Sequence, residues 1–209
     1  MVHGLEGSGA AGYIRSLSTA ALRAGFAAHR FHMRTCGGTE HLCRTLYHAG
    51  LTSDLLGGVA RIPQGRPRTG ISRRVFHWVG TWCSNSPARW GNRCADSVQG
   101  VCSLFRRRSI WRPARAASGS ATIALYEARF VRAMRERLCA MGRYQKRDLA
   151  GLRSVFELDD RFTAPSFGFG DAANYYRTQS AVGYLAGLRV PSLSHTSQAT
   201  TPSCPLRDL

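Results

Sequence analysis

A glycine-rich turn at residues 3–8, His-Gly-Leu-Glu-Gly-Ser, constrains the fold of this chain more than any other stretch. It lies at the end of a short apolar start and before a helical pattern, so we interpret it as a strand that turns into a helix. Gly4 and Gly7 allow backbone angles that a side chain would disfavour. Such a turn can point backbone N–H groups at an anion near a helix start. The alternative is an ordinary strand-to-helix turn that binds no ligand.

Apolar residues then recur at helical spacing. Ile14, Leu17 and Leu22 share one face, which predicts a helix over residues 10–24 that stops at Gly25. The remaining predicted elements are a strand at 26–33, a loop at 35–39, a short helix within 41–48, helices at 52–62 (capped by Thr52), 124–141 and 146–156, a turn at 159–165, a helix capped by Asp171 and a strand at 188–193. Helices that alternate with buried strands indicate a parallel, doubly wound sheet, so we expect an α/β fold.

The charge of the chain is strongly unbalanced. It carries 29 basic residues, of which only Lys146 is a lysine, against 12 acids, for a net charge of +17. Residues 72–119 hold nine arginines and one acid, together with all four tryptophans, and show no helical or strand period. One hypothesis is therefore a basic nucleic-acid-binding protein that uses Arg106, Arg107, Arg108 and these tryptophans for phosphate contact and stacking.

The seven cysteines favour neither a zinc site nor a disulfide scaffold. No Cys-x-x-Cys pair is present, and the count is odd. We expect free thiols in a reducing, cytoplasmic setting, because the chain has no secretion signal and no apolar run of about 18 residues that could span a membrane. No metal or organic cofactor is implied.

Three blocks, in this order and spacing, resemble one family. The first is the 3–8 turn with Tyr13. The second joins Arg34, Cys36 and Gly37-Gly38 to residues 47–55, and the third runs from 125–127 through 156–160, 163–165, 168–169 and 175–177 to 189–191. Together they resemble the YheT-like branch of the α/β-hydrolase superfamily, a group of esterases. The resemblance covers residues 2–70 and 124–193.

This resemblance implies an α/β-hydrolase fold with a helical lid region, and an enzyme that cleaves small carboxylic esters. The Leu5 N–H would be one oxyanion donor, with Gly4 permitting its approach. His3, Tyr47 and His48 become pocket candidates. Each also has a structural interpretation: His3 would brace the turn, and Tyr47 and His48 would pack against other parts of the chain.

The catalytic residues of the family are not identifiable here. A Ser-Asp-His triad needs a nucleophile on a strand-turn-helix elbow, which we expect near Phe76 and His77, but the chain has no Gly-x-Ser-x-Gly. The family's acid would follow Leu193, and its histidine would lie beyond Leu209. Asp159 and Asp160 resemble a catalytic or metal pair, but in this context we expect them to cap and brace a lid helix.

A neighbouring reading frame explains why the resemblance stops at 72–119. If each codon is read from its third base, His77-Trp78 forces Leu, Trp78-Val79 forces Gly and Trp82-Cys83 forces Val. The shifted stretch can then read Gly-Phe-Ser-Leu-Gly-Gly-Asn-x-Val, which is the missing elbow at the expected place. A genuine, divergent basic insertion is the alternative.

We therefore expect one partial α/β-hydrolase domain over residues 1–209, with residues 72–119 and 194–209 out of frame. Because the chain begins at the end of a strand, we do not expect Met1 to start an intact domain. As written, the chain is expected to lack esterase activity and to bind no nucleic acid.

Overall fold

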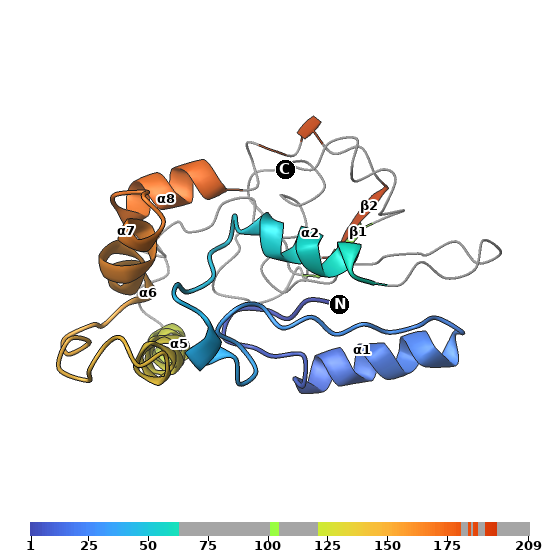
Figure 1. Cartoon of the computed structure of the whole chain (residues 1–209), viewed down its shortest axis with the longest axis horizontal. Helices are drawn as coiled ribbons and strands as arrows, with labels where there is room; N and C mark the ends of the chain where they lie inside the picture. The colour runs from blue at the N-terminus through green and yellow to red at the C-terminus, as the bar shows by residue number, and fades with distance from the viewer. Residues whose placement is uncertain (63–100, 105–120, 181–183, 185, 188–190, 196–209) are drawn as a thin grey trace.

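In a computed structural model the described residues are 1–62, 101–104, 121–180, 184, 186–187 and 191–195 (Figure 1). The expected position of the nucleophile, near residues 76–77, and the cluster of Arg106, Arg107 and Arg108 lie outside the described residues. In Figure 1 the helices α6, α7 and α8 are grouped at the left above α5, and α1 and α2 lie to the right.

Three of the predicted helices are confirmed. They are α1 at Gly12–Arg23, α2 at Thr52–Ala60 and α5 at Ala121–Ala140. Helix α1 ends where Gly25 takes a left-handed φ of +79°, the conformation that closes helices with a glycine. In α2 the N-cap residue is Leu51, which has no capping side chain, so Thr52 is the first helical residue and not the predicted cap.

In the C-terminal region most of the helices lie at other residues than predicted. This region contains α6 at Val155–Leu158, a π-helical turn η2 at Asp159–Thr163, α7 at Ala164–Ser166 and α8 at Ala172–Gln179. The helix expected over 146–156 is wrong, because residues 146–151 form turns and α6 begins only at Val155, and the turn expected over 159–165 is also wrong. The Asp171 cap is confirmed, since its Oδ1 accepts a hydrogen bond from the Asn174 N–H at 2.7 Å.

The expected doubly wound parallel sheet is wrong. Within the described ranges, the only strands are β1 at Val101–Leu104 and β2 at Ser192–His195, which pair in parallel. The strand expected over 26–33 is reduced to one isolated parallel bridge between Val2 and Phe31. Strands buried on both faces of a parallel sheet need nearly continuous apolar residues, and His29, Arg30 and His32 interrupt this segment. The described part of the chain is mainly helical.

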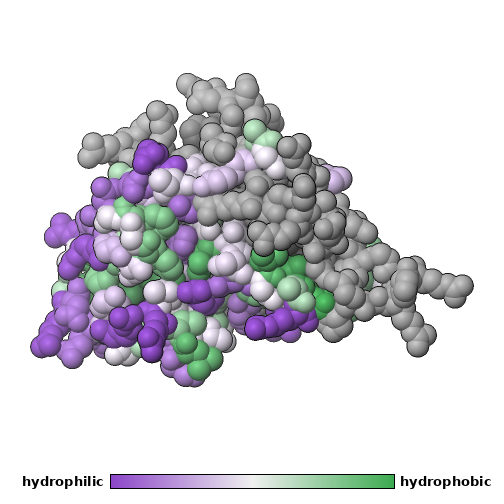
Figure 2. Space-filling model, turned by 45° about the horizontal axis from the view of Figure 1, so that its top comes forward, coloured by the Kyte–Doolittle hydropathy of each residue, from purple (hydrophilic) through white to green (hydrophobic). Residues whose placement is uncertain are grey.

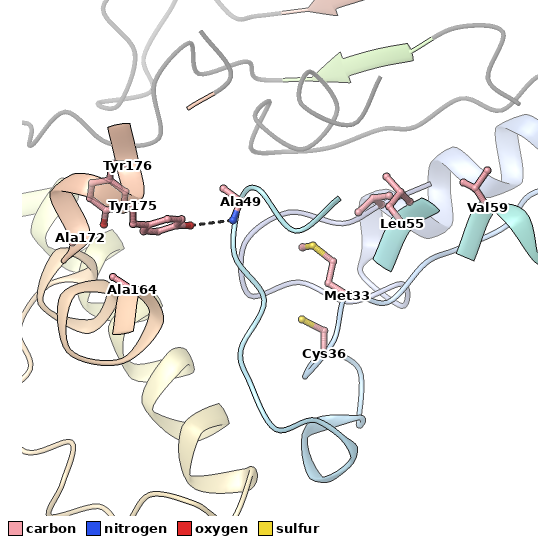
Figure 3. Close-up of a cluster of buried hydrophobic side chains, with 10 residues drawn as sticks. Met33, Cys36, Ala49, Leu55, Val59, Ala164, Ala172, Tyr175 and Tyr176 are labelled. Carbon is pink, nitrogen blue, oxygen red and sulfur yellow. Dashed lines mark hydrogen bonds between the residues drawn. The ribbon is translucent and has the colours of Figure 1, made fainter. Parts of the chain in front are cut away.

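Buried side chains form two hydrophobic clusters. One joins residues of the first 60 positions to α7 and α8, and Figure 3 shows most of its members: Val2, Met33, Cys36, Ala49, Leu55, Val59, Ala164, Ala172, Tyr175 and Tyr176. The other packs α5 against α6 and the preceding turns: Leu46, Val131, Met134, Leu138, Met141, Leu149, Leu152, Val155, Leu158 and Phe162. Segments far apart in sequence therefore share both clusters.

On the face shown in Figure 2, hydrophilic residues cover much of the surface of the described residues, with hydrophobic residues between them. Among the described residues, no helix is long and apolar enough to cross a membrane.

Candidate functional site: the N-terminal turn

Residues 4–7 form a tight turn whose hydrogen bonds are well defined. The Gly7 N–H donates to the Gly4 carbonyl at 3.0 Å, and the Gly4 N–H donates to the Tyr13 hydroxyl at 2.7 Å. The left-handed residue is Glu6, with φ of +56°, and neither glycine of the turn has a positive φ. A side chain at this angle is disfavoured by roughly 1 kcal/mol. Contacts from elsewhere in the chain must therefore hold Glu6 in place.

Gly7 is required by space and not by its backbone angle. A Cβ placed on it would lie 3.0 Å from the Gly4 carbonyl oxygen and 3.2 Å from the His3 side chain. The prediction that glycines supply unusual angles here is therefore corrected: Glu6 adopts the unusual angle, and Gly7 permits the close packing.

His3 is fully buried and both of its ring nitrogens are engaged. Nδ1 lies 2.8 Å from the Gly4 carbonyl, and Nε2 accepts a hydrogen bond from the Met33 N–H at 3.1 Å. This pattern fits a neutral ring protonated at Nδ1. Burial lowers the pKa of His3 to about 4, which keeps the ring neutral. In this geometry His3 braces the turn against the Met33 loop.

The Leu5 N–H lies between these bonded groups. Within the described ranges, no hydrogen bond from the Leu5 N–H to the protein is present, whereas the N–H groups of Gly4, Glu6 and Gly7 all donate. A backbone donor without a protein acceptor inside a well-held turn can serve an anion. The family resemblance implies this N–H as an oxyanion donor, and that role stays a prediction.

A buried ion pair links Glu6 of the turn to Arg137 of α5. Arg137 Nη2 lies 2.8 Å from Glu6 Oε2, and the two side chains are only 8% and 7% exposed. The Arg137 guanidinium also lies 5.3 Å from the centre of the Tyr47 ring, and its Nη1 donates to Cys36 Sγ at 3.1 Å. Four separate segments therefore meet at one guanidinium.

Burial shifts the pKa values of the two acidic groups beside Arg137, the Glu6 carboxyl and the Cys36 thiol. Burial raises the pKa of Glu6 to about 7, although Arg137 and the Tyr47 hydroxyl oppose the rise. Burial likewise raises the pKa of Cys36 to about 12, so the thiol stays protonated and is a poor nucleophile.

Sequence analysis did not identify Arg137 as important. A signal was present, because Arg137 lies three residues after Met134 and four before Met141, on the apolar face of the helix. An arginine on such a face needs a buried partner. The sequence could not reveal that the partner was Glu6, 131 positions earlier in the chain.

The other two pocket candidates lie in different surroundings. The Tyr47 hydroxyl accepts a hydrogen bond from the Glu6 N–H at 2.9 Å, so Tyr47 is part of the turn's support. His48 is buried among aromatic rings of the C-terminal region, with ring centres 4.3 Å from Phe167, 5.2 Å from Phe169 and 6.0 Å from Tyr175. His48 thus packs against the third block of the resemblance, and a role in a pocket stays a prediction.

Asp159 and Asp160 both hold α8. Asp160 Oδ1 accepts a hydrogen bond from the Ala172 N–H at 2.8 Å, and Asp159 Oδ2 accepts one from the Tyr176 hydroxyl at 2.7 Å. Burial raises the pKa of Asp159 to about 6. The described residues contain no group of three or more His, Cys, Asp or Glu side chains placed to hold a metal ion.

Comparison with known proteins gives one weak similarity. The chain is 27% identical over 204 residues to the protein named "Putative esterase YheT" of Escherichia coli (strain K12), an alignment that covers 91% of this chain. The chain spans 57% of the length of that relative. No protein-family model matches the chain, and no solved structure matches it. The chain is therefore related to an esterase-like protein.

Proposed function

We propose that this chain derives from a carboxylic ester hydrolase. The observation that carries the proposal is the similarity, along nearly the whole chain, to the protein named "Putative esterase YheT". The geometry of the N-terminal turn agrees with it, because hydrolysis of an ester passes through a tetrahedral oxyanion that needs N–H donors. The substrate class is a small carboxylic ester.

In this proposal the Leu5 N–H is one oxyanion donor. The turn around it is held by Tyr13, Tyr47 and His3, so the donor is fixed before substrate arrives. Loss of one such donor typically lowers the rate about 10²–10³-fold. The second donor would be the N–H that follows the nucleophile.

The chain as written lacks a recognisable nucleophile, and we propose that it is inactive for this reason. The described candidates do not replace it, because the Cys36 thiol is buried and protonated and both His3 nitrogens are engaged. Removing the nucleophile of a serine hydrolase costs about 10⁶ in kcat. A shift of reading frame through residues 72–119 is our explanation for the loss.

The nucleotide sequence tests this explanation. Read from their third bases, codons 74–83 are predicted to spell Gly-Phe-Ser-Leu-Gly-Gly-Asn. A third base of Val79 that gives Arg, or of Phe76 that gives Pro, contradicts the frame shift.

Activity of the chain as written provides a second test. We expect no hydrolysis of p-nitrophenyl acyl esters above background and no labelling by a fluorophosphonate. Labelling at a single serine would show an active nucleophile and would contradict the proposed inactivity.

A nucleic-acid-binding function would depend on residues 72–119, nearly all of which lie outside the described residues. No observation on the described residues favours it.

A further inference from the structure

We propose that Arg137 is a positioning residue that acts through Glu6 to hold the 4–7 turn in the conformation that presents the Leu5 N–H. This inference rests on the proposed role of that N–H as an anion donor. The juxtaposition that carries it is a buried ion pair between a residue of the turn and a residue of α5.

The turn depends on Glu6 in two ways. The Glu6 backbone has a left-handed φ of +56°, and the residue is directly bonded to Leu5. A change of φ or ψ at Glu6 therefore reorients the peptide units on either side of it. A residue other than glycine keeps a left-handed φ only where contacts with other residues stabilise it.

Two contacts stabilise the left-handed conformation of Glu6. The Glu6 N–H donates to the Tyr47 hydroxyl at 2.9 Å, and the Glu6 carboxylate pairs with Arg137 at 2.8 Å. The contacts act at opposite ends of the same residue, so backbone and side chain are both fixed. Tyr47 itself packs against the Arg137 guanidinium, which couples the two contacts.

Arginine suits this position better than lysine does. Its planar head presents several donors in fixed directions, and here one nitrogen reaches Glu6 while another reaches Cys36 Sγ at 3.1 Å. The ring of Tyr47 lies within cation–π distance of the same head at 5.3 Å. A lysine ammonium has one charged atom and could satisfy only part of this arrangement.

Removal of Arg137 would leave the Glu6 carboxylate buried and unpaired. A buried charge without its partner is strongly unfavourable, so the carboxyl is expected to take up a proton or to move toward water, and in either case its ion pair no longer holds the Glu6 side chain. The Glu6 backbone thereby loses one of the two contacts that stabilise its left-handed φ. The Leu5 N–H then loses its fixed direction even though no atom of Leu5 has changed.

Residue-resolved hydrogen–deuterium exchange on the full chain at pH 8, where Glu6 of the original chain is ionised, tests this inference. We expect Arg137→Met to speed exchange of the Glu6 and Gly7 amides by at least ~10-fold, with the amides of α1 changed less than ~3-fold. Arg137→Lys should restore part of the protection. Arg132→Met is the matched control, because Arg132 lies on the same helix in an exposed pair with Glu136 and should leave the turn unchanged.

A double-variant cycle shows whether Arg137 acts through Glu6. Glu6→Gln combined with Arg137→Met should exchange like Glu6→Gln alone, because the charge that Arg137 serves is gone. If Arg137→Met unfolds the whole chain, Glu6→Gln alone carries the test, since it should loosen the turn while α1 stays protected.

Two results overturn the inference. The first is that the Glu6 and Gly7 amides exchange in Arg137→Met at the rate of the original chain. The second is that the effects of Glu6→Gln and Arg137→Met on exchange simply add in the double variant. Because the readout is amide exchange and not activity, this failure is distinct from failure of the proposed esterase function.

Discussion

At the scale of single residues, the buried carboxyl of Glu6 makes stability depend on pH. Its pKa in the folded chain is about 7, above its ordinary value of 4.5, so the folded chain retains a proton that the unfolded chain loses. The associated stability is full below about pH 4.5 and is lost as pH rises through 7. His3 acts in the opposite direction, because its pKa is lowered to about 4 and its contribution is lost as pH falls.

Comparison with Glu6→Gln isolates the contribution of Glu6. Urea unfolding of both proteins between pH 5 and 8 should show the original chain losing stability relative to the variant as pH rises. The relative change should be on the order of 2 kcal/mol. His3 and Asp159 are common to both proteins, so their effects cancel. Parallel stability curves for the two proteins would show that Glu6 does not titrate in this range.

At the scale of elements, α8 shows how a short helix depends on its first turn. The Asp171 side chain caps the Asn174 N–H, and Asp160 holds the Ala172 N–H. Asp171→Ala should lower the free energy of unfolding by about 1 kcal/mol, measured by urea denaturation. Asp171→Asn keeps an acceptor oxygen and should cost much less. Equal losses in the two variants would show that the cap contributes nothing.

Helices were predictable from sequence where an apolar face repeats. Ile14 begins the face of α1, and Val131, Met134 and Leu138 define that of α5. The 146–156 segment misled because Leu149, Leu152 and Val155 also recur at helical spacing. Leu149 and Leu152 are buried from a non-helical segment, Val155 begins α6, and the φ of +78° at Gly151 interrupts the helical path.

At the scale of the whole molecule, the features that the sequence did not predict depend on contacts between residues far apart in the chain. The expected sheet failed because its strands would have needed uninterrupted apolar segments, and Arg30 interrupts one of them. The turn itself was predictable from local sequence, and the donor role of the Leu5 N–H, which the family resemblance implies, stays a prediction. The support of that turn was not predictable, because Tyr47 and Arg137 reach Glu6 from 41 and 131 positions away.

Esterase activity after restoration of the reading frame is the most direct test of the central claim. The same gene, expressed with its frame restored through codons 74–123 and after codon 193, together with the flanking coding sequence, should hydrolyse p-nitrophenyl acyl esters. We expect a rate at least ~10³-fold above that of the chain as written, and its loss when the recovered elbow serine becomes alanine. A folded, frame-restored protein that hydrolyses no ester faster than the chain as written would contradict the account.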